Sequence, residues 1–263
     1  MLFRFLIASV VLLGYCGWKR IPPPNKRDLP LVIAAGFVGL FLYMWAFITG
    51  TSFVTAGISS FIIASAPIFT LILSIVFLKE KASLTIWLGV LISFLGLAII
   101  SFTQAGELQL NIGIFLLLTA SVFTSIFMII QKRLLRNYTA IQSSAYSVGF
   151  AALCMSIFLP TLVREFPHAP MSANLVIVYL GVFPAAISYF LLNLALSRVE
   201  KTIYITSFFY LIPFLASIMA FFWLGEEISA LALLGGVIII AGMVITNAIQ
   251  RKHIPQEEST KKT

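Results

Sequence analysis

Long apolar runs are the feature that most restricts what this sequence can fold into. A helix needs about 20 consecutive apolar residues to cross the roughly 30 Å hydrocarbon core of a bilayer. Such runs cover about residues 1–18, 29–49, 53–78, 84–102, 111–131, 141–163, 175–197, 203–224 and 230–249. They predict an all-α membrane protein, a polytopic bundle of nine transmembrane helices.

The overall composition agrees with a membrane protein. The chain is 60% hydrophobic and only 10% charged, whereas soluble domains carry about a quarter charged residues. The first run has one alternative, because Arg4 precedes an apolar core as in a signal peptide. That run ends in "GYCGWKR", which is bulky and then basic, and Tyr15 stands where a lipoprotein signal needs a small residue before Cys16.

The positive charges predict how the chain is oriented. If the loops alternate between the two sides of the membrane, 15 of the 17 Lys and Arg fall on one side. They are Lys19, Arg20, Lys26, Arg27, Lys79, Lys81, Lys132, Arg133, Arg136, Arg198, Lys201, Arg251, Lys252, Lys261 and Lys262. Positive loops stay cytoplasmic, so the C-terminus is expected inside, with 250–263 as a solvated cytoplasmic tail. This distribution also argues against nucleic-acid binding as the reason for the net charge of +8.

One line of sequence is written twice. The stretch "PIFTLILSIVFLKEKASLTIWLGVLISFLG" begins at Pro67, and "PFLASIMAFFWLGEEISALALLGGVIIIAG" begins at Pro213, 146 residues later. The pairs that stand out are Pro67 and Pro213, Glu80 and Glu226, Ser83 and Ser229, Gly89 and Gly235, and Gly96 and Gly242. Apolar residues often match by chance, but five such pairs at one offset do not.

The two copies cross the membrane in opposite directions in the expected topology. The sequence therefore predicts two inverted repeats, 1–102 with four helices and 111–249 with five. Inverted repeats are typical of secondary transporters, whose substrate lies near the midplane between the halves.

Each element of the repeated line has a physical role. The prolines can bend their helices, and the serines fit N-caps of the helices that follow. The glutamates precede those same helices, where a carboxylate suits the positive end of the dipole. The paired glycines, seven apart on one helix face, allow close packing. These roles favour a fold signature over a binding site, with the prolines best suited to both.

The motif resembles the EamA family of the drug/metabolite transporter superfamily. Members of that family look like two inverted units of five helices, with a proline-containing fourth helix that ends in Glu. Here Pro67 to Glu80 and Pro213 to Glu226 match that helix, and "FRFLIAS", with Arg4 and Phe5, resembles the second helix. The resemblance covers about 1–250 and implies a transporter without specifying its substrate.

The first unit departs from the family pattern. The counterpart of 111–131 would begin about 35 residues before Met1. The sequence favours a start codon placed too late, with a fragment or a genuine nine-helix variant as alternatives. We expect an upstream open frame of about 35 codons that encodes one more apolar segment, and an unstable or inactive chain without it.

Ordinary enzyme chemistry has no carriers within the apolar runs. No Asp or Glu lies mid-membrane, so a carboxylate proton relay has no obvious carrier. There is no Ser/His/Asp set, HExxH or CxxC at membrane depth, and Cys16 and Cys154 are interpreted as small apolar residues. Arg4 lies close enough to a helix end to snorkel. We expect no catalysis, metal or cofactor.

Aromatic and hydroxyl side chains remain as candidates for binding. Tyr43 and Tyr189 lie 146 residues apart, and each follows an expected bend, at Gly36 and Gly39 or at Gly181 and Pro184. Interrupted helices at matching places in two halves point to a transport site. The candidate substrate-binding residues are Tyr43, Trp45, Ser121, Ser125, Tyr189, Asn193, Tyr204 and Tyr210. The alternatives are interfacial positions for the aromatic rings and hydrogen bonds from the hydroxyls to their own helix.

These features predict a secondary transporter that moves a small metabolite, an amino-acid-like or drug-like solute, across the cytoplasmic membrane by alternating access. A cavity without fixed charge favours neutral or zwitterionic solutes, or lipophilic cations held by aromatic faces. A non-transporting membrane module, an inactive truncated fragment and an intramembrane enzyme are the alternatives. The expected partners are a small-molecule substrate and the lipid bilayer; a homodimer is left open, and no nucleic acid is expected.

Overall fold

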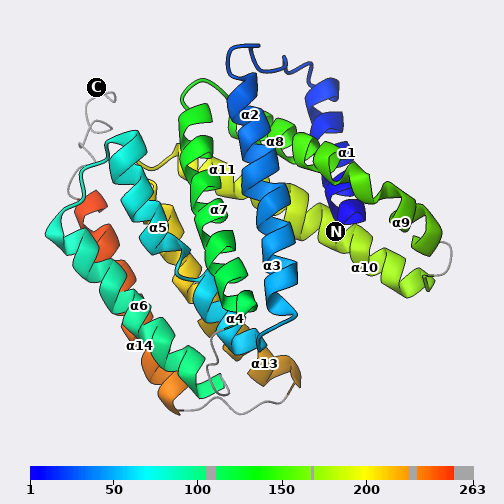
Figure 1. The fold of residues 1–263 in the computed structure, drawn as a ribbon. Helices are drawn as coiled ribbons and strands as arrows, with labels where there is room; N and C mark the ends of the chain where they lie inside the picture. Colours follow the sequence, from blue (N-terminus) through cyan, green and yellow to red (C-terminus); the bar gives the residue numbers. More distant parts are fainter. Residues whose placement is uncertain (105–110, 167–168, 225–229, 252–263) are drawn as a thin grey trace, which may run out of the picture. The chain divides into compact units, whose positions relative to one another are not determined.

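The structure is a computed structural model that describes residues 1–104, 111–166, 169–224 and 230–251. These residues form helices and no strands (Figure 1). The helices are α1 (Leu2–Trp18), α2 (Leu29–Gly36), η1 (Phe37–Leu42), α3 (Tyr43–Thr51), α4 (Ala56–Ile63), α5 (Ala66–Leu73), η2 (Ser74–Leu78), α6 (Leu84–Gln104), α7 (Ile112–Leu134), α8 (Ala140–Met155), η3 (Ser156–Phe158), α9 (Leu159–Glu165), α10 (Met171–Gly181), η5 (Val182–Ile187), α11 (Ser188–Ser197), α12 (Ile203–Thr206), η6 (Ser207–Tyr210), α13 (Leu211–Leu224) and α14 (Ala230–Arg251). The predicted all-α class is confirmed.

Seven helical spans, several of them made of more than one helical element, are long and apolar enough to cross a membrane. They are Leu29–Thr51, Gly57–Leu78, Ile112–Leu134, Ala140–Arg164, Met171–Ser197, Ile203–Trp223 and Ala230–Ala248. Two shorter apolar helices, Leu2–Trp18 and Leu84–Ile100, coincide with the other two predicted segments. The chain is therefore a multi-pass membrane protein, and the count of nine crossings stays a prediction.

The chain divides into two compact units. Unit 1 comprises Met1–Gly50 and Phe115–Val199, and unit 2 comprises Thr51–Ile114 and Glu200–Thr263. Each unit therefore draws helices from both predicted repeats.

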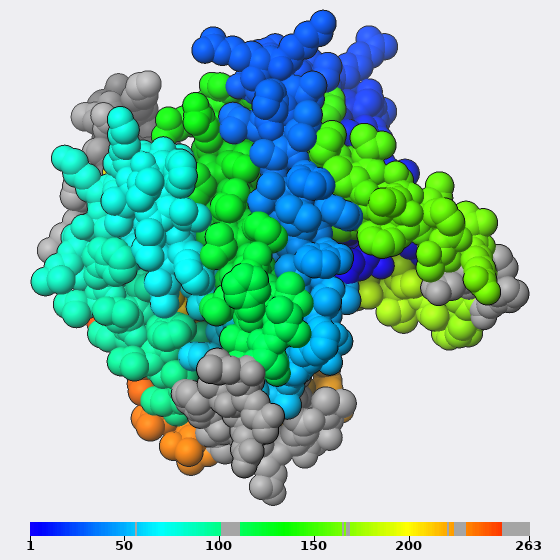
Figure 2. All heavy atoms as spheres, viewed as in Figure 1, coloured from blue at the N-terminus to red at the C-terminus, as the bar shows by residue number. Residues whose placement is uncertain are grey.

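Unit 1 is held together by close approaches at small residues. A Cβ added to Gly39 in η1 would lie 2.6 Å from Cβ of Phe127 on α7, and one added to Gly36 in α2 would lie 2.8 Å from the Ser147 carbonyl oxygen on α8. Figure 2 shows the blue side chains of α2 and α3 packed against the green ones of α7. These two glycines thus let one long helix touch two neighbours.

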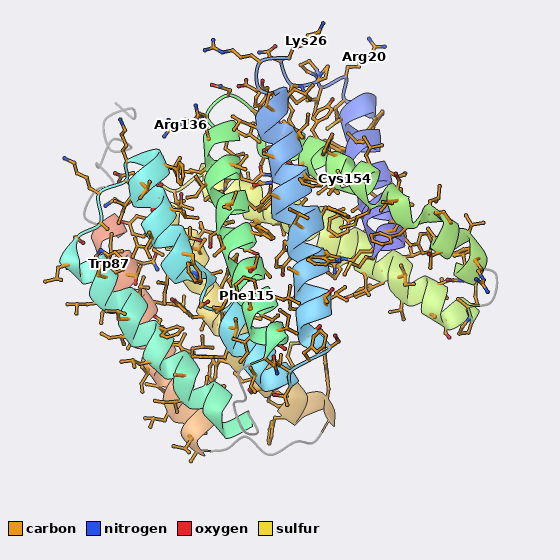
Figure 3. The ribbon with its side chains drawn as sticks, in the orientation of Figure 1. Arg20, Lys26, Trp87, Phe115, Arg136 and Cys154 are labelled. Atoms are coloured by element: carbon orange, nitrogen blue, oxygen red, sulfur yellow. The ribbon has the colours of Figure 1, made fainter. Side chains whose placement is uncertain are left out.

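The basic loops of unit 1 gather at one end of it. Figure 3 labels Arg20, Lys26 and Arg136 at the end where α7 finishes, and Phe115 near the other end of that helix. Within unit 1 this arrangement fits the sidedness expected from the positive charges.

The repeated glycines bring α6 and α14 together in unit 2. A Cβ on Gly89 would lie 2.7 Å from the Gly242 carbonyl oxygen, and one on Gly96 would lie 2.6 Å from that of Gly235. The reverse contacts are equally short, at 2.6 and 2.7 Å, and the two helices run side by side in Figure 1. The predicted close-packing face is confirmed, and each copy of the motif packs on the other.

The N-caps follow the sequence in part. The hydroxyl of Ser83 accepts from the Ile86 N–H at 3.4 Å, as expected for the N-cap of α6. Ser229 and Glu226 lie outside the described residues. The sequence predicted that the Glu80 carboxylate faces the N-terminus of α6. It instead accepts hydrogen bonds from Thr202, at the N-terminus of α12.

The prolines of the motif stand at helix starts. Helix α4 ends at Ile63 and α5 begins at Ala66, so Pro67 is the second residue of a new helix, where its missing N–H has no intrahelical role. Pro213 is the third residue of α13, directly after the 3₁₀ turn η6. The expectation that each proline bends a continuous helix is therefore corrected: each stands just after a break.

Candidate functional site

Two π-helical turns interrupt equivalent places in unit 1. The first, η1, covers Phe37–Leu42 and leads directly into Tyr43; the second, η5, covers Val182–Ile187 and precedes Tyr189 by two residues. Single π-helical turns inside α-helices occur frequently at functional sites because they leave backbone groups without their usual partners. The interruptions predicted before the two tyrosines are thus present, as local rewinding of the helix.

Arg4 reaches the second of these turns. Its Nη2 donates to the carbonyl oxygen of Pro184 at 3.3 Å. Pro184 lies midway along the 27-residue span Met171–Ser197. The guanidinium is therefore held at the middle of a neighbouring helix, and the expectation that Arg4 snorkels to a membrane surface is wrong.

The two tyrosines lie close to Arg4 and to each other. Tyr43 and Tyr189 are near enough to interact electrostatically, and both interact in this way with the guanidinium of Arg4. The hydroxyl of Tyr43 also faces that of Thr124. We call Arg4, Tyr43, Thr124 and Tyr189 the arginine–tyrosine cluster, which joins α1, α3, α7 and α11 within unit 1.

Aromatic rings surround the cluster. The ring of Tyr189 lies 5.8 Å from that of Phe127 in an edge-to-face arrangement and 6.3 Å from that of Phe5. The guanidinium of Arg4 lies 5.9 Å from the Phe5 ring centre. The donors of the cluster are thus set in an apolar frame, where hydrogen bonds are stronger than in water.

Asn193 belongs to a separate polar link behind Tyr189. Its Nδ2 donates to Ser144 Oγ at 2.7 Å, and Ser144 Oγ donates to the Tyr189 carbonyl oxygen at 3.1 Å. Asn193 is fully buried. This position makes Asn193 a support for the helix that carries Tyr189.

A second polar link joins α7 to α8. Nε2 of Gln131 donates to Ser147 Oγ at 2.9 Å, and the hydroxyl of Ser143 donates to Gln131 Oε1. All three side chains are buried. A buried amide whose two ends are both satisfied fixes the pairing of two membrane helices.

Three other predicted residues of unit 1, Ser121, Ser125 and Trp45, are not members of the arginine–tyrosine cluster. Ser121 and Ser125 on α7 donate to the carbonyl oxygens four residues before them, at 3.0 and 2.8 Å. Trp45 is half exposed and lines an apolar cavity of about 440 Å³ with Leu2, Phe41 and other residues of unit 1.

Tyr204 and Tyr210 belong to unit 2. Both side chains are buried, at 1% and 0% exposure. The hydroxyl of Tyr210 has no hydrogen-bond partner within the described ranges, and Lys201 Nζ lies 5.9 Å from the ring centre of Tyr204.

Arg4 lies deeper in the bundle than its place in the sequence predicts. An arginine inside an apolar run was the signal available, but its nearness to the start of that run favoured an interfacial position. Gln131 was missed as well, although it is an amide within the same apolar segment as Ser121 and Ser125. The part of the chain that the structure describes holds no cluster of metal-ligating side chains.

A protein-family comparison decides the class of this bundle. The model of the EamA-like transporter family matches residues 1–102 and 111–248. The chain belongs to the EamA-like transporter family. Family membership and the names of its relatives indicate a transporter rather than an enzyme.

Named relatives cover most of the chain. It is 37% identical to the uncharacterized transporter YdfC of Bacillus subtilis, over 93% of this chain and 80% of that protein. It is 32% identical to a probable terminal-alkyne amino-acid exporter of Streptantibioticus cattleyicolor, over 94% and 82%. It is 28% identical to an S-adenosylmethionine uptake transporter of Rickettsia conorii, over 97% and 85%.

The fold has a counterpart among solved structures. One crystal structure superposes with a TM-score of 0.75 at 16% sequence identity, covering 95% of this chain and 87% of the other. At this identity the likeness concerns the fold alone.

Proposed function

We propose that this EamA-like protein is a secondary transporter that carries a small amino-acid-like solute across the cytoplasmic membrane by alternating access. In this proposal, residues 1–102 and 111–249 are inverted repeats, the chain crosses the membrane nine times and the C-terminus is cytoplasmic. The observation that carries the proposal is the pair of π-helical turns, η1 and η5, each just before a tyrosine of the arginine–tyrosine cluster.

The paired turns favour transport for a physical reason. Interrupted helices at corresponding places of two halves put unpaired backbone groups beside a site, and they mark the points where a helix changes direction most easily. A module that only scaffolds partners has no need of such turns on both sides of one polar cluster.

The solutes for which two relatives are named support an amino-acid-like solute. A terminal-alkyne amino acid and S-adenosylmethionine, which two relatives are named for, both carry an α-amino acid group. The aromatic frame around the cluster suits the apolar part of such a solute.

Counterflow into sealed vesicles tests the function. The purified full chain is reconstituted into liposomes preloaded with one unlabelled amino acid, and entry of the same labelled amino acid is followed, with protein-free liposomes as the control. Label accumulation for at least one protein amino acid is the expected result. Traces that match the protein-free control for every amino acid would favour a non-transporting membrane module.

A further inference from the structure

The guanidinium of Arg4 is a charge inside the bundle that the described protein leaves unpaired. It makes one hydrogen bond among the described residues, to the Pro184 carbonyl oxygen, and its buried Nε has no partner there. An arginine carries five N–H donors in a planar fork. Most of its hydrogen-bonding capacity is therefore open to another group.

Among the residues that the structure describes, no acidic residue lies in the middle of an apolar run. Asp28, Glu80, Glu165 and Glu200 each fall in a loop or at a helix end. A buried charge without a counter-charge is strongly unfavourable in a membrane. A negative group beside the guanidinium would remove that penalty.

The groups around Arg4 are of the kind that complete an anion site. Tyr43 and Tyr189 are near enough to the guanidinium to interact with it electrostatically, and the hydroxyl of Tyr43 faces that of Thr124. The Tyr189 ring lies 6.3 Å from that of Phe5, whose centre is 5.9 Å from the guanidinium. Arg4, Tyr43 and Tyr189 are each only partly buried. An arginine fork matches the two oxygens of a carboxylate, and the hydroxyls add further donors.

We propose that Arg4, with the hydroxyls of Tyr43 and Tyr189, binds the carboxylate of the transported solute. This assignment rests on the proposed transport function and specifies its substrate class: solutes with a carboxylate next to an apolar or aromatic portion. The sequence alone favoured neutral or zwitterionic solutes or lipophilic cations, on the expectation of a cavity without fixed charge. The assignment replaces that range, because the cluster carries one fixed positive charge.

The same geometry connects binding to the helix interruption. The fork of Arg4 also holds the Pro184 carbonyl oxygen in η5. A carboxylate that takes donors from this fork changes how firmly η5 is held. Occupancy of the site is thereby coupled to the turn at which the helix is interrupted.

Matched acid and amide ligands test the assignment. Binding to the purified full chain is measured for leucine and leucinamide, methionine and methioninamide, and phenylalanine and phenylalaninamide. At least one acid is expected to bind about 10- to 100-fold more tightly than its amide, the range for loss of hydrogen bonds to a charged group. Equal affinity for every acid and amide, or no binding by any of the acids, would overturn the assignment.

Variants separate binding from folding. R4Q is expected to lose the preference for the acid, whereas R4K, which keeps the charge but not the fork, retains part of it. Arg164→Gln changes an exposed arginine of the same unit and is expected to keep the full preference. Thermal melting without ligand is recorded for each variant to show that it folds. If R4Q does not fold, the test relies on the preference of the R4K, Tyr43→Phe and Tyr189→Phe variants for the acid over its amide. An undiminished preference in all three contradicts the assignment.

Counterflow distinguishes this inference from the proposed function. Carboxylate-selective binding without counterflow would sustain the site and overturn transport. Equal counterflow of an acid and its amide would sustain transport and overturn the carboxylate site.

Discussion

The backbone N–H of Thr202 donates to both carboxylate oxygens of Glu80 at 3.1 Å, and the Thr202 hydroxyl donates to Oε1 at 2.8 Å. Thr202 is the residue before α12 and is fully buried. Glu80 therefore compensates the free N–H groups at the start of a helix 122 residues away.

Removing this carboxylate is expected to destabilise the protein. Glu80→Ala leaves the donors of buried Thr202 unpaired, which costs about 1–3 kcal/mol, whereas Glu80→Gln retains one acceptor and loses less. Thermal melting of the purified protein checks the order wild type, Gln, Ala. Glu200→Gln, an exposed change two residues before Thr202, is the control. An Ala variant that melts like the wild type would contradict the capping role.

The glycine contact between α6 and α14 makes a second prediction. Gly89→Ala places a Cβ 2.7 Å from the Gly242 carbonyl oxygen, so the helices must separate, at about 1–3 kcal/mol. Gly14→Ala on α1 has nothing within 4 Å and should be neutral or stabilising by up to about 1 kcal/mol. Melting temperature and the monodisperse fraction on size exclusion measure both; equal behaviour of the two variants would refute the tight contact.

Cysteine labelling tests whether the two tyrosines face the solute path. With Cys16 and Cys154 first replaced by Ala, Tyr43→Cys and Tyr189→Cys are each expected to react with a membrane-impermeant thiol reagent. An amino acid active in counterflow should slow the reaction. Leu40→Cys, one turn earlier and only 1% exposed, should stay unlabelled. Absence of labelling at both tyrosine positions would place the rings in packed protein or lipid.

The helix breaks near the prolines are expected to affect the transport rate. Pro67→Ala and Pro213→Ala supply an N–H that lets each break close into continuous helix. Restoring one hydrogen bond of about 0.5–1.5 kcal/mol should slow counterflow roughly two- to tenfold, with expression unchanged. Rates equal to wild type in both single variants and in the double variant would remove the breaks from the mechanism.

Tyr138 provides a prediction about pH. Its hydroxyl donates to Asp28 Oδ2 at 2.7 Å and accepts from the Asn25 N–H at 3.0 Å, beside a cavity of about 470 Å³. The hydrogen bond to the Asp28 carboxylate raises the pKa of the Tyr138 phenol above its usual 10.0. Because the folded pKa is the higher one, the stability from this contact is complete below about pH 10 and is lost as the pH rises through the raised value.

Comparison of Tyr138→Phe with the wild type measures this effect. The wild type should melt at a higher temperature at neutral pH, and the difference should shrink only at strongly alkaline pH. In an ultraviolet titration the variant should lack one phenol, the one that ionises late in the wild type. A difference in melting that is lost already between pH 7 and pH 9 would contradict a raised phenol pKa in the folded protein.

Sequence alone determined the class of this protein and most of its segment boundaries. In lipid, the backbone N–H and C=O groups of a run of about 20 apolar residues find their hydrogen-bond partners within a helix. The Pro, Glu and Gly residues at one offset carry the family signature. The EamA-like match over 1–102 and 111–248 agrees with both. The glycine faces were also readable, since a seven-residue spacing is a property of one helix. These signals are local, so no packing had to be known.

Only the tertiary structure decided which groups meet. The sequence shows only where Arg4 lies along its own helix, close to the start, and this predicted a position at the membrane surface. The depth of its guanidinium depends on the neighbouring helix that it reaches, at Pro184. Glu80 was paired with the helix next in sequence, whereas its partner Thr202 comes from a distant segment. A side chain takes the donor or acceptor that packing brings within about 3 Å, and contacts between distant helices leave no periodic trace in the sequence.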